Sequence, residues 1–85
     1  MNPGIYVGEF ADYHDIQDFA NNTNSVFKAG VKFAEIGFAE SGLYVGAFWV
    51  GRKPSVAAVE AELKRSKIEM DEDGITWDGE AEGLK

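Results

Sequence analysis

A seven-residue run occurs twice in this chain. Residues 4–10 read Gly-Ile-Tyr-Val-Gly-Glu-Phe and residues 42–48 read Gly-Leu-Tyr-Val-Gly-Ala-Phe, so five of the seven positions are identical. The copies are 38 residues apart, which is close to half of the 85-residue chain. Each copy is a short apolar and aromatic run, typical of a β-strand, and each is followed by a helix-like segment. The repeat therefore predicts two βα halves in one chain.

The segments around the first copy predict a strand and a helix. The strand is expected over residues 5–10. Asp12 is a good N-cap for a helix over residues 12–20, because its side chain can accept a hydrogen bond from a free backbone N–H. The asparagine-rich run 21–24 is expected to end this helix, since asparagine competes with helical hydrogen bonds.

The segment 26–38 has two interpretations. Apolar and polar side chains alternate with one change of phase near Phe33-Ala34, which predicts a long strand with a β-bulge at that point. A helix that starts at residue 24 or 25 and stops at Gly42 is the alternative. Two interior glycines disfavour this helix, and the sequence leaves the choice open.

The second copy of the repeat begins a similar series. A strand is expected over residues 43–51, and a helix over residues 55–66, where proline and serine favour the start. Residues 67–78 read as a hairpin, because Asp73-Gly74 stands between two apolar runs.

This order of elements predicts an α+β fold of the ferredoxin-like kind. We expect a βαββαβ two-layer sandwich with an extra C-terminal hairpin strand. In this arrangement the two copies of the repeat are the central strands, expected as parallel neighbours, and both helices cover one face of the sheet. A single domain is expected over residues 1–78, and a frayed acidic tail over residues 79–85.

Strand alternation places the aromatic residues of both copies on one face of the sheet. If the aliphatic residues pack against the helices, the opposite face is open and aromatic. The residues of this expected aromatic face are Tyr6, Phe10, Tyr44 and Phe48. Such a face can stack bases, bind apolar groups or meet a second subunit. The alternative is that the aromatic residues form the core or are covered by the C-terminal hairpin, and periodicity does not decide between the two.

The composition disfavours an enzyme. The chain has no cysteine and one histidine, so neither a thiolate site nor a multi-histidine metal site is available. No nucleophile motif or glycine-rich phosphate loop occurs, and no cofactor or catalytic residue is expected. Residues 69–80 have partial calcium-loop spacing, which gives a weak alternative metal site. Its ligands would be Glu69, Asp71, Asp73 and Glu80. Hairpin-turn chemistry is the preferred explanation of this run.

Charge is segregated along the chain, whose net charge is −7. Residues 1–27 hold four acids and no base, whereas residues 68–85 hold seven acids and one base. An acidic surface repels phosphate backbones and attracts basic protein surfaces. We expect the partner-binding carboxylates to be Asp12, Asp15, Asp18, Asp71, Glu72 and Asp73.

Two family resemblances rest on the first copy of the repeat. Residues 5–10 resemble the first-strand motif of RNA recognition motif domains, which share the βαββαβ order and about this length. The resemblance implies that Tyr6 is a stacking aromatic residue. Residues 41–48 keep only the glycine and the last aromatic residue of that family's third-strand motif. Residues 5–13 also resemble the opening of ArdA antirestriction proteins, which are acidic mimics of DNA.

These observations lead to one expected function and two alternatives. The first is a non-enzymatic inhibitor or nucleic-acid mimic, of the anti-defence kind, that presents carboxylates to a basic, nucleic-acid-binding protein. The second is a small dimeric ferredoxin-like protein with a ligand on its aromatic face, and the third is an RNA-recognition-like binder of single strands. No secretory signal and no apolar stretch of about 18 residues occurs, so a cytoplasmic protein without a membrane partner is expected.

Overall fold

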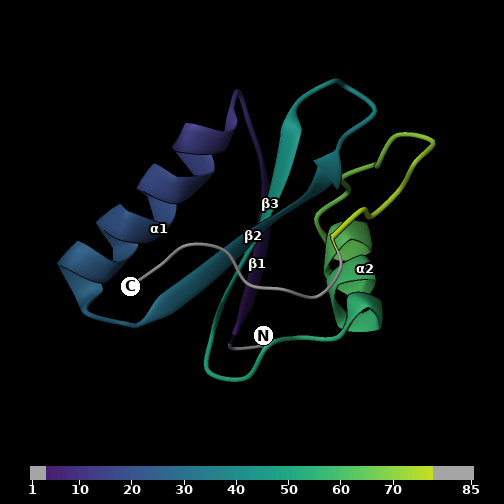
Figure 1. Cartoon of the computed structure of the whole chain (residues 1–85). Coiled ribbons are helices and arrows are strands. Elements are labelled where there is room, and N and C mark those ends of the chain that lie inside the picture. The colour runs from purple at the N-terminus through teal and green to yellow at the C-terminus, as the bar shows by residue number, and fades with distance from the viewer. Residues whose placement is uncertain (1–3, 78–85) are drawn as a thin grey trace.

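The computed structural model describes residues 4–77 of the chain, as two helices and a three-stranded sheet (Figure 1). The elements follow in the order β1 (Ile5–Phe10), α1 (Tyr13–Phe27), β2 (Val31–Phe38), β3 (Tyr44–Val50) and α2 (Val56–Arg65). The strand order in the sheet is β1-β3-β2, and both pairs are antiparallel. Among the described residues, no helix is long and apolar enough to cross a membrane.

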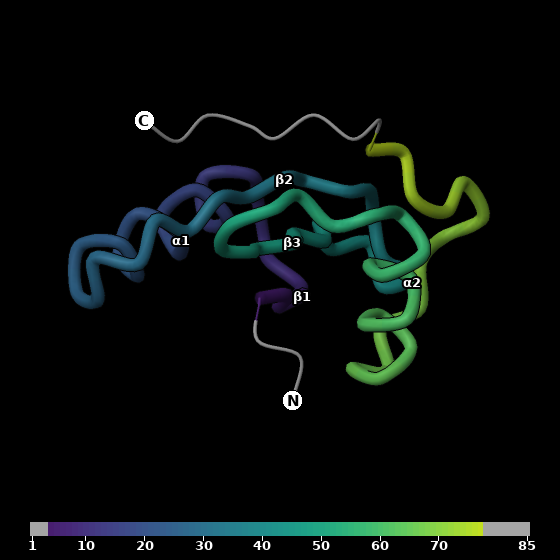
Figure 2. The backbone as a smooth tube through the Cα atoms, turned by 90° about the horizontal axis from the view of Figure 1, so that it is seen from below, coloured from purple at the N-terminus to yellow at the C-terminus, as the bar shows by residue number. Residues whose placement is uncertain are grey.

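The structure confirms a small α+β fold but differs from the ferredoxin-like arrangement in two respects. The last strand of that arrangement is absent from residues 67–77, and residues 78–85, with the expected tail, lie outside the described residues. The helices also pack on opposite faces of the sheet, as Figures 1 and 2 show from two directions. The expectation that both helices cover one face is therefore wrong.

The two copies of the repeat are neighbouring strands, as expected, but they run antiparallel rather than parallel. Their register is nearly two-fold symmetric about Gly8, which pairs with Gly46. Tyr6 then lies opposite Phe48, and Phe10 lies opposite Tyr44. The orientation follows from the connections. Helix α1 returns the chain so that β2 runs parallel to β1, and the short β2–β3 turn then reverses it, so β3 is antiparallel to both neighbours.

Both faces of the sheet are buried, each against a different helix. On one face, Ile16 and Ala20 of α1 pack with Phe33 and Phe48. On the other face, Val59 and Leu63 of α2 pack with aliphatic residues of the strands and with two tryptophans. The strand residues and tryptophans of this cluster include Val7, Ala34, Ile36, Val45, Ala47, Trp49 and Trp77. Burial on both faces explains why the central strand reads as a continuous apolar run.

Helix α1 ends seven residues later than the sequence indicates. It runs through the asparagine-rich stretch to Phe27 and stops at Lys28, which has a left-handed backbone (φ 53°) and donates its N–H to the Asn24 carbonyl. Asn24 stabilises this end, because its side-chain amide makes hydrogen bonds of 3.0 and 2.6 Å to the backbone of Val31. The N-terminus is as predicted, with Asp12 accepting a hydrogen bond from the Asp15 N–H.

Strand β2 contains a bulge, but not where the sequence indicates it. The change of phase near Phe33-Ala34 arises because Phe33 faces α1 and Ala34 faces α2, and both are buried. The register instead shifts between Glu35 and Gly37. The segment 26–38 is thus neither one strand nor one helix, since it begins in α1 and ends in β2.

The predicted hairpin over residues 67–78 is also wrong in the described part. A turn forms where Gly74 donates its N–H to the Asp71 carbonyl, but the flanking residues do not pair with each other. They bond to the outer edge of β2 and to the turn after it, through three backbone hydrogen bonds of 2.7–2.9 Å: Glu40 N–H to Glu69 C=O, Asp71 N–H to Phe38 C=O, and Thr76 N–H to Ile36 C=O. Gly37 permits this contact, because a Cβ there would lie 2.8 Å from the Gly74 oxygen.

Helix α2 matches its sequence signals. Ser55 is the N-cap and accepts a hydrogen bond from the Ala58 N–H at 3.1 Å. Lys64 and Arg65 lie in the last turn, where positive charge stabilises the helix dipole.

The two paired glycines give a test of how α1 is held. A Cβ at Gly46 would lie 2.9 Å from Cγ2 of Ile16, which is fully buried, so Gly46→Ala must displace the helix. We expect a loss of about 1–3 kcal/mol in the free energy of unfolding, measured by urea denaturation. Gly8→Ala is the matched control. Its Cβ would meet the ring edges of Phe10 and Tyr6, which can move, so its cost should stay below about 1 kcal/mol. Equal costs would contradict this packing.

Gly37→Ala should release the segment 69–76 from β2. Backbone strain alone costs about 1–3 kcal/mol. The substitution combines a positive φ of 138° with a backbone clash, so we expect the free energy of unfolding to fall by more than this. Amide hydrogen exchange should accelerate at Asp71 and Thr76, whose N–H groups bond to β2. Gly42→Ala has similar strain at φ 94° but no atom within 4 Å, and it should leave both amides protected. Unchanged protection in Gly37→Ala would contradict the role of this glycine.

Candidate functional site

Four aromatic rings cluster where α1 crosses the sheet. Phe19 of α1 lies over the sheet residues, with ring-centre distances of 4.8 Å to Phe48, 5.6 Å to Tyr6 and 5.9 Å to Phe10. Tyr6 and Phe10 each also contact the Phe48 ring, at 5.9 and 5.7 Å. The cluster therefore joins β1, β3 and α1 through stacked and tilted rings.

The expected open aromatic face is closed over β3 and open over β1. Phe48 is only 3% exposed, whereas Tyr6 is 53% exposed. Phe10 is half-buried, and so is Tyr44, whose ring lies 4.8 Å from that of Phe38. The expectation of an uncovered face is thus wrong for Phe48 and correct for Tyr6, because α1 lies over the β3 side of this face.

Sequence patterns did not identify Phe19 as a site residue. Its side chain is 39% exposed and borders the open part of the aromatic face. The sequence signal for its place in the site is its helical spacing from Thr23. Phe19 and Thr23 are four residues apart on α1, and both line the cavity beside Tyr6.

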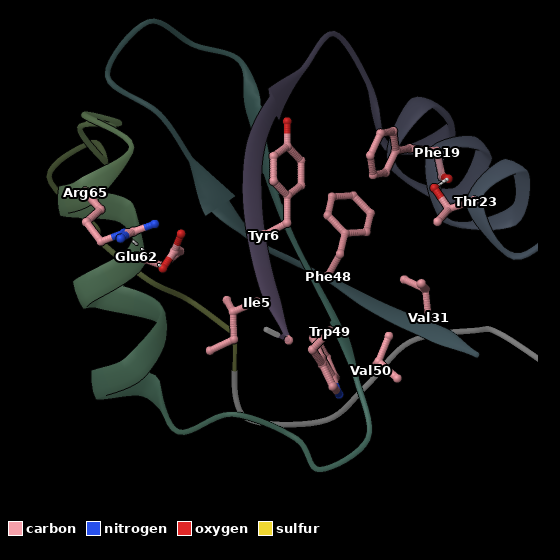
Figure 3. Close-up of a pocket in the computed structure, with 11 residues that line it drawn as sticks. Ile5, Tyr6, Phe19, Thr23, Val31, Phe48, Trp49, Val50, Glu62 and Arg65 are labelled. Atoms are coloured by element: carbon pink, nitrogen blue, oxygen red, sulfur yellow. Dashed lines mark hydrogen bonds and ion pairs between the residues drawn. The ribbon is translucent and has the colours of Figure 1, made fainter. Parts of the chain in front are cut away.

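A cavity of about 560 Å³ lies along β1, as Figure 3 shows. On one side it is lined by aromatic and aliphatic groups from β1, β3, β2 and α1, namely Tyr6, Phe48, Val50, Val31, Phe19 and Thr23. On the other side it is lined by Ile5 and by Glu62 and Arg65 of α2, which form an ion pair at 3.6 Å. We call this cavity the β1 groove. It follows the strand on both of its faces, with one apolar wall and one wall that carries charge.

The predicted carboxylates of α1 are all on the surface. Asp12, Asp15 and Asp18 are exposed, at spacings of three residues along the helix. Within residues 4–77, none of the three lies within ion-pair distance of a basic side chain. Their charges are therefore available to a partner.

The predicted carboxylates of the second group lie in the turn after α2. Glu72 and Asp73 are exposed, while Asp71 is half-buried and its side chain accepts a hydrogen bond from the Asp73 N–H at 3.1 Å. Helix α1 and this turn lie on opposite sides of the sheet (Figure 1). The six residues therefore do not form a single patch.

Additional acids link the two groups at one end of the molecule. Glu9 at the end of β1 accepts a hydrogen bond from the Ser41 hydroxyl at 2.7 Å, and the neighbouring Glu40 donates its N–H to the Glu69 carbonyl. We call this the acidic end; its members are Glu9, Asp12, Glu40, Glu69, Glu72 and Asp73. Four bases lie at the opposite end of the sheet, in the α1–β2 connection, at the start of β2 and after β3: Lys28, Lys32, Arg52 and Lys53. Lys64 and Lys67, however, line one hollow together with Glu69, so acidic and basic side chains are only partly separated along the strands of the described residues.

The calcium alternative gains no support in the described residues. No group of three or more potential ligands is close enough to hold a metal ion in the part of the chain that the structure describes. Asp71 instead holds the backbone of its own turn. Glu80, the fourth expected ligand, lies outside the described residues.

Comparisons with known proteins give no relative: no family model matches the chain, and neither a curated protein nor a solved structure matches it.

The aromatic cluster can be tested through two phenylalanines on the same helix. Phe19→Ala removes three ring contacts and should lower the free energy of unfolding by about 1–3 kcal/mol. Phe27 is 73% exposed, so Phe27→Ala should change it by less than about 0.5 kcal/mol. Thermal or urea unfolding of both variants measures the difference. A Phe27→Ala loss as large as that of Phe19→Ala would contradict the assigned packing.

Proposed function

We propose that this domain is a non-enzymatic binding protein that presents carboxylates to a basic, nucleic-acid-binding protein and inhibits it. The observation that carries the proposal is the set of exposed carboxylates that lack a basic partner within residues 4–77. Spaced carboxylates can replace phosphates at a basic surface, because both offer negatively charged oxygen acceptors.

The charge balance at the acidic end supports this function. Its six carboxylates outnumber Lys64 and Lys67, the bases that line a hollow with Glu69, so this end keeps a net negative charge. Such a field attracts a basic partner and repels nucleic acid itself. Direct binding of single strands through Tyr6 is therefore the less favoured alternative, although this ring is exposed.

The experiment is a competition assay. Labelled duplex DNA is bound to a small, sequence-nonspecific basic DNA-binding protein, and the acidic domain is added at increasing salt concentration. We expect it to displace the DNA, and we expect its own affinity for the basic protein to fall as salt screens the contacts.

Charge-neutral variants identify the surface that acts. The triple variant Asp12→Asn, Asp15→Asn, Asp18→Asn removes three charges and preserves the helix cap, because asparagine caps as well as aspartate. Each exposed ion pair contributes about 0.2–1 kcal/mol, so three should weaken binding about tenfold. The double variant Glu72→Gln, Asp73→Asn tests the other side of the sheet, and Glu60→Gln on α2 is the control. If the displacement of DNA depends neither on salt nor on either set of substitutions, the proposal is refuted.

A further inference from the structure

The β1 groove has the composition of a small-molecule site. Its volume of about 560 Å³ lies within the range of about 300–1,000 Å³ that is usual for ligand pockets. Most of its lining is aromatic or aliphatic, and its two charged side chains, Glu62 and Arg65, stand at one wall. A pocket of this kind takes an apolar ligand that carries a polar group at one position.

The apolar wall of the groove has accessible ring surface. Tyr6 and Phe19 are stacked with their ring centres 5.6 Å apart, and both contact the buried Phe48. Tyr6 is nevertheless 53% exposed and Phe19 is 39% exposed within the described residues. A ligand that covers these rings removes apolar surface from water, which contributes about 25 cal/mol for each Å² covered. The wall therefore favours a ligand with an apolar chain or ring.

Arg65 is the accessible charge of the groove. Its side chain is 67% exposed, whereas that of Glu62 is 13% exposed. At 3.6 Å, the Arg65 Nε and Glu62 Oε1 atoms are too far apart for a hydrogen bond, and no second carboxylate lies within ion-pair distance of Arg65 in residues 4–77. A guanidinium can bond both oxygens of one carboxylate through two parallel N–H···O bonds. The charged wall of the groove therefore favours an anion over a cation.

Basic side chains also flank the groove. Val31 and Val50 line it and pair with each other across β2 and β3. Lys32 directly follows Val31, and Arg52 and Lys53 come shortly after Val50; all three bases are exposed. The carboxylates of the acidic end lie at the other end of the strands. An anion in the groove is therefore attracted by these neighbours, and a cation is repelled.

We propose that the β1 groove binds a small amphiphilic carboxylate, with its apolar chain against Tyr6 and Phe19 and its carboxylate at the Arg65 guanidinium. Figure 3 shows Arg65 and Phe19 on opposite sides of β1, so the ligand lies across the outer edge of this strand. The site is independent of the proposed function, because the acidic end is at the opposite end of the strands. Two copies of the chain, each with a net charge of −7, repel each other, which disfavours a second copy as the occupant.

The test is a titration of the full chain with three probes that share an octyl-type chain and differ in their head group: octanoate, 1-octanol and octyltrimethylammonium. Two-dimensional NMR of the backbone amides follows binding, and the shifts should concentrate around Tyr6, Phe19 and Arg65. We expect octanoate to saturate the site and to bind at least about tenfold more tightly than octyltrimethylammonium and about threefold more tightly than 1-octanol, because only the carboxylate pairs with the guanidinium. High salt should reduce this advantage of octanoate.

Two pairs of variants locate the ligand. Arg65→Gln should weaken octanoate binding about fivefold and leave 1-octanol binding unchanged. Lys64→Gln is its control, because it removes a neighbouring charge in the last turn of α2 that does not line the β1 groove, and it should change octanoate binding by less than about twofold. Tyr6→Ala should weaken octanoate and 1-octanol alike, by about fivefold, whereas Phe27→Ala removes an exposed ring outside the groove and should have less than about a twofold effect.

The opposite outcomes overturn the inference. If the three probes bind equally, apolar contact alone holds them and the carboxylate is not recognised. Tighter binding of octyltrimethylammonium would reverse the assigned charge. Amide shifts that are absent, do not saturate or spread evenly over the surface would show that the groove is not a site for this ligand class. Equal losses in Arg65→Gln and Lys64→Gln would remove Arg65 from the site. Sedimentation that shows a dimer, lost in Tyr6→Ala and unaffected by octanoate, would make a second copy the occupant.

Discussion

The contact between Ile16 and Gly46 sets the arrangement of the whole molecule. Gly46 is in the central strand and has no side chain, so the fully buried Ile16 can approach the sheet at this point. Helix α1 is therefore held on the face opposite α2, and each helix has its own core. The same contact covers β3 and leaves β1 at the margin of the helix, where Tyr6 is exposed and the β1 groove begins. Because interiors are densely packed, a single missing Cβ is enough to decide how closely a helix can lie.

Local signals in the sequence were sufficient for most elements and insufficient for their arrangement. The first strand, the N-caps of both helices and the turn near Gly74 follow from residue types with strong local preferences. The extension of α1 to Phe27 depends on a tertiary bond, because Asn24 satisfies the backbone of Val31 across the helix end. Strand periodicity does not show which helix covers which face of the sheet, because the pattern is the same in either arrangement. The place of Phe19 at the edge of the groove was not predicted for the same reason. Helical spacing does not distinguish a fully buried position from one at the margin of a groove.

The candidate binding surfaces divide by chemistry. Carboxylates gather toward the acidic end, whereas the β1 groove is mainly apolar and lies along the edge strand. Long-range charge attracts a partner and sets the rate of association, and apolar burial sets how long it stays.

The near-identity of the two repeat copies raises a question of folding order, since β2 could in principle pair with either copy. Loop closure resolves this competition. Residues 39–43 alone separate β2 from β3, so this hairpin closes early, whereas pairing of Gly8 with Gly46 must close 38 residues of chain. The second copy therefore pairs with β2 before the first copy can compete, and the first copy pairs afterwards with the β2–β3 hairpin. Repetition of a sequence within a small sheet is compatible with a unique native pairing when the connections differ this much in length.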